Sequence, residues 1–296
     1  MPVCSLVHLN GAILPLDGAH ISPLDRGFLF AHAAYEVTAV YGGRFVDLEG
    51  HIARLSRTLD GIGIPDPHDA DGWTALHEAL IARNALQEGL IYLQVTGGAY
   101  DARDFAGPDI LAPTVFAYAD ARPLIGAAAR DGIRAVFLAD SRWKRRDMKT
   151  TQLLSQALAY RAAKEQGAET AFMVEDGLVT EAASANAWIV TASGEIITRG
   201  LSSAILPGIT RAGVFRLAEM RGFTITERAF TPEEALNAAE VFTSSAGAMI
   251  APVIELDGRR IGDGRPGPVT RQVQRFYYEA MGADLRAAAP FVYDRD

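Results

Sequence analysis

The chain is poor in cysteine and contains no long apolar run. Cys4 is its single cysteine, so no internal disulfide can form, which fits a protein of the reducing cytosol. Residues 1–6 are too short and too polar for a secretory signal, and no apolar run approaches the length of a membrane span. We therefore expect a cytoplasmic protein that has no membrane partner.

Positive charge is also scarce, because 28 lysines and arginines are outnumbered by 36 aspartates and glutamates, a formal net charge of -8. Binding to nucleic acid or to an anionic membrane needs a basic face that contacts phosphates. The local exception is the run RWKRRDMK from Arg142 to Lys149. We interpret most of this run as a loop balanced by neighbouring carboxylates, and we expect no nucleic-acid partner.

Several motifs of catalysis and binding are missing. No GxSxG turn is present. The six histidines are scattered without the spacing of metal ligands, so we predict no metal site. The segment GDGRPG at 262–267 fits GxGxxG, but Pro266 lies inside it and too little chain follows for a dinucleotide-binding unit. We predict that this segment is a turn.

The length of 296 residues, with 49% hydrophobic and 22% charged residues, is typical of a soluble enzyme with two medium domains. The stretch around Pro123 and Gly126 loses periodicity between two predicted strands. We therefore predict an α/β (α+β) protein with a smaller N-terminal α/β domain at 1–120, a linker at 121–126 and a larger C-terminal domain at 127–296. Lys149 falls in the larger domain.

The first domain is predicted to begin with two hairpins, because Asn10-Gly11 and Gly42-Gly43 each separate alternating apolar runs. Apolar residues at helical spacing predict helices over 48–61 and 73–86. Two further strands fit the segments 90–96 and 114–119. The glycine-rich loop 97–109 between them has the length and composition of a loop that carries function.

In the second domain, Lys149 is expected on a loop between a strand at 133–138 and a helix that Gly167 ends. Thr150 and Thr151 are possible N-caps of that helix. A hairpin that turns at Asp176-Gly177 is predicted to end at Glu181, and small residues follow it. The remaining predicted elements are a helix that begins near 207–210, a strand from 240 that enters a small-residue loop, and a last helix over 268–281.

Three segments in this order and spacing resemble the pyridoxal-phosphate aminotransferases of fold type IV: RWKRRDMK ending in Lys149, VTEAASANAWIV with Glu181, and ILPGITR with Thr210. This family contains the D-amino-acid, branched-chain and (R)-amine transaminases, with aminodeoxychorismate lyase as a relative. The resemblance runs from about Asp17 to Gly267. It implies pyridoxal 5'-phosphate as cofactor, a two-domain fold with the active site in the cleft between the domains, and a homodimer that builds each site with a loop from the neighbouring subunit.

The resemblance also implies roles for single residues. Lys149 would be the Schiff-base lysine and proton shuttle, and Glu181 would face the pyridine nitrogen and keep it protonated. Taken alone, each of these residues is more often a solvated surface charge.

The cofactor phosphate needs a separate set of donors. The helix that begins near Thr210 offers free N–H groups and the positive end of its dipole. The resemblance adds the amides of Ile209 and Thr210, Arg54 as the charged partner, and Ser245 or Ala246. Relatives often carry a hydroxyl residue where this chain has Ala246, and Arg54 alone would be a helix-surface charge.

Substrate preference depends on two segments. Tyr35 resembles the tyrosine beside the substrate carboxylate in D-amino-acid transaminases, and the following Glu36-Val37-Thr38-Ala39 departs from the Glu-Gly-Ile-Arg pattern of branched-chain enzymes. In the loop 97–109, Arg103 has no histidine beside it, whereas the familiar D-amino-acid transaminases carry an Arg-x-His pair there. (R)-amine transaminases also use an arginine on a mobile loop.

We therefore interpret the chain as a transaminase that moves an amino group between D-amino acids (D-alanine, D-glutamate) and 2-oxo acids (2-oxoglutarate, pyruvate). The alternatives are an (R)-amine transaminase, then a branched-chain L-amino-acid aminotransferase or aminodeoxychorismate lyase. From a different class, a non-catalytic ligand-binding module on the same scaffold is also open.

Overall fold

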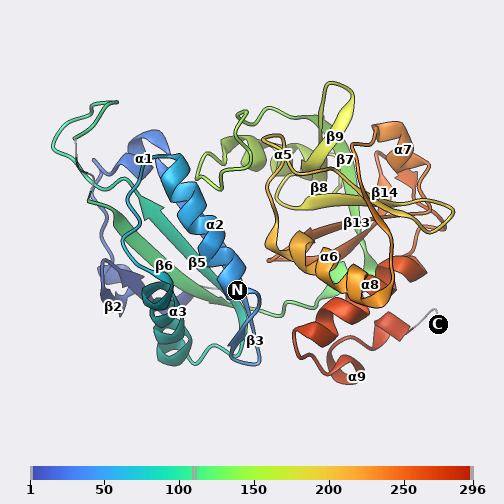
Figure 1. The fold of residues 1–296 in the computed structure, drawn as a ribbon, viewed down its shortest axis with the longest axis horizontal. Coiled ribbons are helices and arrows are strands. Elements are labelled where there is room, and N and C mark those ends of the chain that lie inside the picture. Colours follow the sequence, from blue (N-terminus) through green and yellow to red (C-terminus); the bar gives the residue numbers. More distant parts are fainter. Residues whose placement is uncertain (1–2, 109, 111, 294–296) are drawn as a thin grey trace. The chain divides into compact units, whose positions relative to one another are not determined.

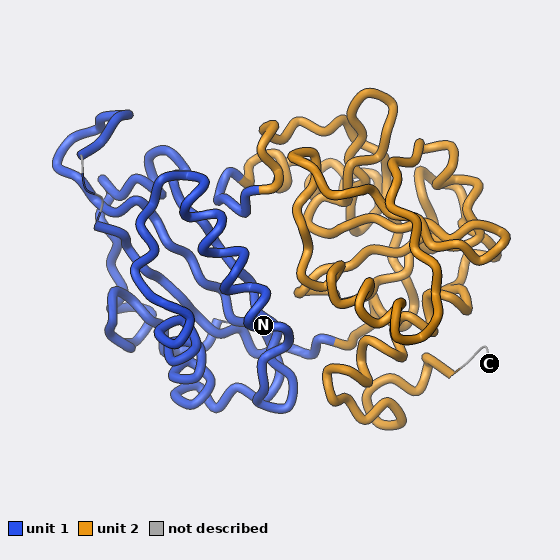
Figure 2. The backbone as a smooth tube through the Cα atoms, in the orientation of Figure 1, with its two compact units in different colours: residues 1–124, 148–152 blue, residues 125–147, 153–296 orange. Residues whose placement is uncertain are grey.

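A computed structural model describes residues 3–108, 110 and 112–293 of the protein. Its contacts divide the chain into two compact units, shown in different colours in Figure 2. Unit 1 comprises Met1–Leu124 and Met148–Gln152, and unit 2 comprises Ile125–Asp147 and Leu153–Asp296. An α/β protein of two domains was predicted, and helices and sheets occur in both units.

Unit 1 is built on one antiparallel sheet of six strands in the order β2-β1-β6-β5-β3-β4. The strands are β1 (Val3–Leu9), β2 (Ala12–Pro15), β3 (Ala33–Tyr41), β4 (Arg44–Phe45), β5 (Glu88–Thr96) and β6 (Thr114–Ala121). The helices are η1 (Leu16–Gly18), α1 (Arg26–Phe30), α2 (Leu48–Gly61) and α3 (Ala70–Asn84).

The predicted hairpins and helices of unit 1 are all present. The hairpin β1–β2 turns at Asn10-Gly11, and β3–β4 turns at Gly42-Gly43. The helix α3 begins three residues before the predicted start because Asp69 caps it, accepting a hydrogen bond from the Gly72 amide at 2.8 Å.

Helices α2 and α3 pack against one face of this sheet, α2 on β3 and α3 on β1 and β6 (Figure 1). Alternate strand residues on that face join the helices in a core around Leu55, Leu59 and Trp73. Tyr35, Tyr92 and Tyr118 alternate with these core positions, so they lie on the opposite face of the sheet.

Unit 2 contains a mixed sheet of nine strands, with the order β12-β11-β10-β13-β14-β7-β8-β9 and with β15 paired to β14. The strands are β7 (Ile133–Ala139), β8 (Thr170–Glu175), β9 (Leu178–Ala182), β10 (Asn186–Val190), β11 (Ile196–Thr198), β12 (Ile225–Glu227), β13 (Glu240–Ser245), β14 (Met249–Leu256) and β15 (Arg259–Arg260). The helices are α4 (Ala127–Asp131), α5 (Leu154–Glu165), α6 (Ile209–Arg221), α7 (Pro232–Leu236), α8 (Pro268–Ala280), α9 (Leu285–Ala288) and η2 (Pro290–Tyr293).

The hairpin, the helices and the strand that were predicted for this part of the chain are all found among these elements. The chain turns between β8 and β9 at Asp176-Gly177, both with positive φ. The segment 262–267 is a turn, as predicted. Helix α5 packs on β7 and β8, whereas α6 and α8 pack on each other and on β13.

The prediction that Thr150 or Thr151 caps a helix was wrong. Helix α5 begins later, at Leu154, and its N-cap Leu153 makes no side-chain cap. The two threonines instead lie along the start of β3. Thr150 forms a β-bridge with Ala34, and Thr151 donates from its amide to the Ala33 carbonyl at 3.1 Å.

The pairing of Thr150 and Thr151 with β3 also affects the boundaries of the two units. The segment Met148–Gln152, with Lys149, groups with unit 1, whereas the sequence prediction assigned residue 149 to the larger domain at 127–296. Backbone hydrogen bonds to β3 cause this difference. In the part of the chain that the structure describes, no helix has both the length and the apolar character needed to cross a membrane.

Candidate active site

Lys149 is held in unit 1 by its backbone. Its amide donates to Thr58 Oγ1 at 3.3 Å, and its carbonyl accepts from the Tyr35 amide at 3.0 Å. Its Nζ lies 4.0 Å from the centre of the Tyr35 ring. Among residues 3–108, 110 and 112–293, no carboxylate forms an ion pair with this amine. The backbone therefore fixes the position of a lysine whose amine is available to react with a carbonyl.

Arg54 is buried on α2 and pairs with Glu36 of β3. Its Nε and Nη2 donate to the two Glu36 oxygens at 2.7 Å each, and His51 Nδ1 lies 2.8 Å from Glu36 Oε2. Burial raises the pKa of Glu36, but Arg54 and His51 outweigh it and hold this pKa far below its ordinary value. Arg54 is therefore a fixed, paired cation and not the exposed charge on the helix surface that its residue type alone suggests.

Tyr35 is half-buried and lies in a row of aromatic rings across unit 1. Its ring stacks on Tyr92 with centroids 5.7 Å apart, and Tyr92 stacks on Tyr118 at 5.1 Å. Burial raises the pKa of Tyr92 well above its ordinary value. The structure thus places Tyr35 beside Lys149, and its hydroxyl-bearing ring lies in the row of tyrosines.

Arg103 lies on the exposed loop between β5 and β6. Its guanidinium carbon lies 5.4 Å from the centre of the Phe30 ring and 5.1 Å from that of Phe105. None of its described contacts is with Lys149, Tyr35 or Arg54. Of the four predicted site residues in unit 1, Lys149, Tyr35 and Arg54 therefore lie in one neighbourhood, and Arg103 does not. In this neighbourhood Thr58 Oγ1 also donates to the Arg54 carbonyl at 2.9 Å.

Glu181 is buried near the end of β9 in unit 2. Its carboxylate accepts from Arg142 Nη1, from Asn186 Nδ2 at 3.2 Å and from the Leu206 amide at 3.1 Å. Burial raises the pKa of Glu181, and the Arg142 guanidinium opposes this rise. Glu181 is 3% exposed, so it is not the solvated surface charge that a glutamate most often is.

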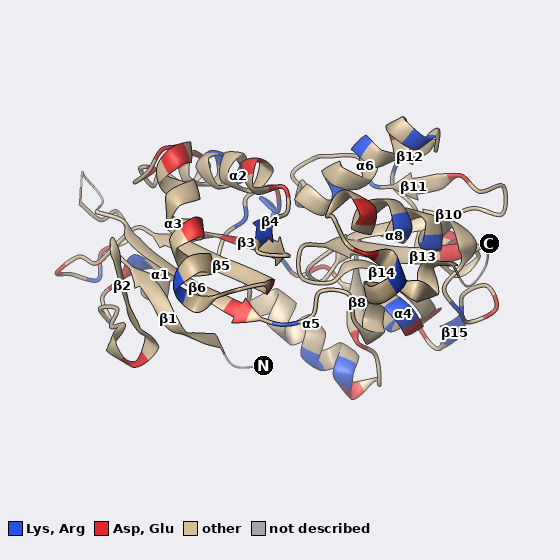
Figure 3. Cartoon of the chain, turned by 90° about the horizontal axis from the view of Figure 1, so that it is seen from below, with Lys and Arg blue, Asp and Glu red and all other residues tan. Residues whose placement is uncertain are grey.

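Most of the basic run 142–149 is balanced by carboxylates, as predicted. Arg142 donates to Asp140 at 2.6 Å, and Arg146 and Lys144 both pair with Glu175. Arg145 pairs with Asp147. In Figure 3, acidic and basic residues occur in both units. Arg142, Lys144, Arg145 and Arg146 of the run are therefore each paired with a carboxylate, and Arg142 also holds Glu181.

The start of α6 is tied to Glu181 through Asn186. Asn186 Nδ2 donates to Glu181 and also to the Leu206 carbonyl at 2.9 Å. A Cβ on Gly208 would lie 2.0 Å from Asn186 Oδ1, so any other residue at this N-cap would have to displace the Asn186 side chain. The hydrogen bonds between described residues leave the amides of Ile209 and Thr210 without an acceptor.

Ser245 is the last residue of β13, the strand that pairs with the strand of Asn186, and Ala246 follows it. Asn186 pairs with Ser244 between β10 and β13, so Ser245 is one residue beyond that pair. Ser245 Oγ accepts from the Ala248 amide at 3.2 Å, within its own turn, and Ala246 carries no hydroxyl. The sequence had indicated these two residues, whereas it did not indicate Asn186, which pairs with the neighbouring Ser244 and donates to Glu181 and to the Leu206 carbonyl before α6.

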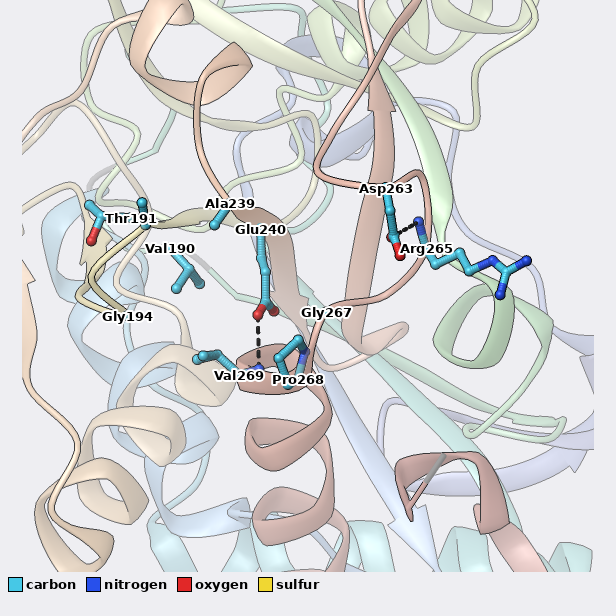
Figure 4. A pocket seen from close by; sticks show the side chains of 11 residues that line it. Val190, Thr191, Gly194, Ala239, Glu240, Asp263, Arg265, Gly267, Pro268 and Val269 are labelled. Carbon is cyan, nitrogen blue, oxygen red and sulfur yellow. Dashed lines mark hydrogen bonds between the residues drawn. The ribbon is translucent and has the colours of Figure 1, made fainter. Parts of the chain in front are cut away.

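A pocket of about 290 Å³ elsewhere in unit 2 contains none of the predicted site residues. Figure 4 shows the Glu240 side chain pointing to the start of α8, where it accepts from the Val269 amide at 2.9 Å. Glu240 also accepts from the Thr270 amide at 2.7 Å. It is thus a helix cap, and this pocket is not the candidate active site.

Comparison with known proteins decides the family. Residues 33–256 match the model of the family described as Amino-transferase class IV. The chain belongs to the class IV aminotransferases. It is 36% identical to the D-alanine aminotransferase of Bacillus licheniformis, over 90% of this chain and 94% of that protein. It is 32% identical to the D-alanine aminotransferase of Listeria innocua, over 97% and 99% of the two chains.

Solved structures of this fold agree with the assignment. The Escherichia coli branched-chain amino acid aminotransferase superposes with a TM-score of 0.87 at 23% identity, covering 96% of this chain and 98% of that one. A hypothetical aminotransferase from Mycobacterium tuberculosis, in a PLP-bound form, gives 0.81 at 24% identity, over 93% and 98%. The predicted fold type IV and the resemblance to its aminotransferases are confirmed. This class IV aminotransferase is a pyridoxal-phosphate-dependent transaminase that acts on amino acids and oxo acids.

The described residues fit this cofactor. An ionised carboxylate has about four acceptor sites, and Glu181 uses three, so it can accept one more hydrogen bond from a protonated ring nitrogen. The open amides of Ile209 and Thr210 at the start of α6 suit a phosphate. Lys149 supplies an amine with no ion pair among the described residues.

Proposed function

We propose that this class IV aminotransferase moves an amino group between D-amino acids, with D-alanine and D-glutamate as donors, and 2-oxo acids, with 2-oxoglutarate and pyruvate as acceptors. The observation that carries this proposal is the 36% identity to a D-alanine aminotransferase over 94% of its length. The structures of branched-chain enzymes share less, for example 23% with that of Escherichia coli. Tyr35 beside Lys149 supports the same choice.

Lys149 is proposed as the Schiff-base lysine that also moves the substrate proton. When bound, pyridoxal phosphate carries the amino group between the two substrates, and its ring takes up the electrons of the bond that is broken. Glu181 is proposed to keep the ring nitrogen protonated, and Arg142 and the Leu206 amide favour its ionised form against the burial that raises its pKa. The Tyr35 ring limits the positions that the Lys149 amine can take.

The phosphate is proposed to bind the amides of Ile209 and Thr210 and the guanidinium of Arg54, with Ser245 as a further donor. Ala246 can offer only its backbone. The dipole of α6 adds a favourable interaction with an anion at its first turn. Glu36 fixes the Arg54 guanidinium in advance, so little side-chain entropy is lost on binding.

Arg54→Ala is expected to weaken cofactor binding by about 10- to 150-fold, because a charge-assisted hydrogen bond contributes about 1.5 to 3 kcal/mol. Cofactor retained after dialysis measures the effect, with Arg57→Ala, an exposed arginine of the same helix, as control. The single variant leaves Glu36 buried without its arginine. A double variant with Glu36→Ala removes this penalty, and recovery of cofactor affinity there would show that Arg54 acts only on the fold.

Arg103 and Tyr35 are proposed to bind the substrate α-carboxylate. A buried carboxylate needs compensating donors, and one arginine without a histidine gives a sparse set. We therefore also propose a slow side activity toward small (R)-primary amines.

The enzyme is further proposed to be a cytoplasmic homodimer, in which the loop with Arg103 serves the neighbouring subunit. Sedimentation of an active monomer at assay concentration would refute the dimer.

The function is tested with the purified holoenzyme, mixed with one amino donor at a time in the absence of any 2-oxo acid. D-alanine and D-glutamate are expected to convert the visible cofactor band at rates well above those of their L-enantiomers. Single-turnover absorbance measures each half-reaction without interference from product release. L-leucine reacting faster than every D-donor would replace this proposal with a branched-chain one.

A further inference from the structure

The loop between β5 and β6 is fastened at its base by Asp25, the N-cap of α1. Asp25 Oδ2 accepts from Thr96 Oγ1 at 2.9 Å and from Thr114 Oγ1 at 2.8 Å. These two threonines are a directly opposed pair, where β5 ends and β6 begins. The Asp25 side chain is only 1% exposed. Its carboxylate therefore joins both ends of the loop to the start of α1.

Arg26, the next residue, fastens the middle of the same loop. Its Nη1 donates to the Asp104 carbonyl and its Nη2 to the Phe105 carbonyl, each at 2.8 Å. Its backbone amide also donates to the Gly98 carbonyl at 2.9 Å. The guanidinium is thus a planar fork on two consecutive carbonyls, and these two residues directly follow Arg103 in the chain.

Two further contacts hold Arg26 itself. Its Nε donates to His32 Nδ1 at 3.1 Å, while His32 Nε2 lies 2.9 Å from the Ile62 carbonyl. Gly107 approaches so closely that a Cβ there would lie 2.7 Å from Arg26 Nη1. Gly107 also has a φ of +75°, which disfavours any side chain. The loop and the guanidinium therefore fit each other tightly.

We propose that Arg26 is a positioning residue that sets the preference of the enzyme for carboxylate-bearing donors, because its fork on Asp104 and Phe105 fixes the loop from which Arg103 reaches the substrate. This proposal rests on the carboxylate-binding role proposed for Arg103. Arg26 itself binds three protein groups and need not touch the substrate. Loss of Arg26 is therefore expected to affect only those amino donors that carry a carboxylate.

The test compares two donors of the same handedness. (R)-2-aminobutane has an ethyl group in the place of the D-alanine carboxylate. In Arg26→Gln, kcat/KM for D-alanine should fall by about 10- to 100-fold, mainly through KM, since a displacement of about 1 Å can cost this much. The value for the amine should change by less than about threefold. Arg57→Gln, on the exposed side of α2, is the control and should change neither.

A double-mutant cycle with Arg103→Ala shows whether Arg26 acts through Arg103. In the Arg103→Ala background, Arg26→Gln should lower the D-alanine value no further. Equal losses for both donors, or losses that add in the double variant, would overturn the proposal. Arg26→Lys cannot donate to both carbonyls in the fork geometry, so it should recover only part of the preference.

Hydrogen exchange of residues 97–108 separates this proposal from the proposed function. Exchange should become faster in Arg26→Gln, and unchanged exchange overturns the fastening role even if the wild-type holoenzyme proves not to use D-alanine. If Arg26→Gln does not fold, Gly107→Ala displaces the same contact and keeps Arg26. Gly107→Ala should show the same faster exchange and the same loss of preference for D-alanine. If its hydrogen exchange and its donor preference both match those of the wild type, the proposal is wrong.

Discussion

Lys149→Ala is expected to lower kcat for transamination by about 10⁴- to 10⁶-fold, because it removes the nucleophile together with the base, and a general base alone contributes about 10²- to 10⁴-fold. The protein should still fold. Both hydrogen bonds that hold this segment, to Thr58 and from Tyr35, involve the backbone of residue 149, and alanine keeps them.

The small number of lysines makes the assignment of Lys149 easy to test. The chain contains three, and the other two are Lys144 and Lys164. Borohydride reduction of the holoenzyme should fix the cofactor to the peptide with Lys149 alone. Lys144→Ala is a matched control from the same basic run, because the Lys144 side chain is 78% exposed and pairs with Glu175. Turnover retained in Lys149→Ala, or cofactor fixed at either other lysine, would refute the assignment.

Local sequence patterns were sufficient to predict most elements of the fold. Asn10-Gly11 and Asp176-Gly177 adopt the positive φ values that tight hairpins need, so their positions were readable from two residues. The helix α2 was predicted because its buried residues, such as Leu55 and Leu59, recur at helical spacing. The same local rule failed at Thr150, since bonding to β3, more than a hundred residues earlier, outweighs its preference as a helix cap.

The candidate site residues could be named from motifs, but their partners could not. Arg54 was indicated as a phosphate partner, whereas its pairing with Glu36 depends on the packing of α2 against β3. Asn186 connects Glu181 with the start of α6, and an asparagine in a buried strand carries no local signal of such a role. Partners of this kind are set by tertiary contacts between separate segments, which no spacing rule describes.

The surroundings of Glu181 determine how its removal should act. Its carboxylate lies among three donors, from Arg142, Asn186 and the Leu206 amide, and Arg142 also pairs with Asp140. Glutamine has the same shape but brings an N–H group against these donors and carries no charge. Removing one partner of a buried ion pair costs about 3 to 5 kcal/mol of stability in general. Asp140 remains to pair with Arg142, so the loss should stay at the lower end of this range.

Glu181→Gln is therefore expected to slow the half-reaction with D-alanine by about 100- to 1,000-fold, the effect of removing one preorganised electrostatic partner. Cofactor affinity should change only a few-fold, because the phosphate donors at Ile209 and Thr210 and the Lys149 amine are untouched. Single-turnover absorbance and cofactor titration measure the two quantities separately. Glu175→Gln is the matched control, since Glu175 also pairs with an arginine of the basic run, but it lies earlier in the same hairpin and its described hydrogen bonds are to Lys144 and Arg146. Its half-reaction should stay within about twofold of wild type. If both variants slow the half-reaction equally, the effect comes from disturbed ion pairs, and Glu181 has no specific role at the ring nitrogen.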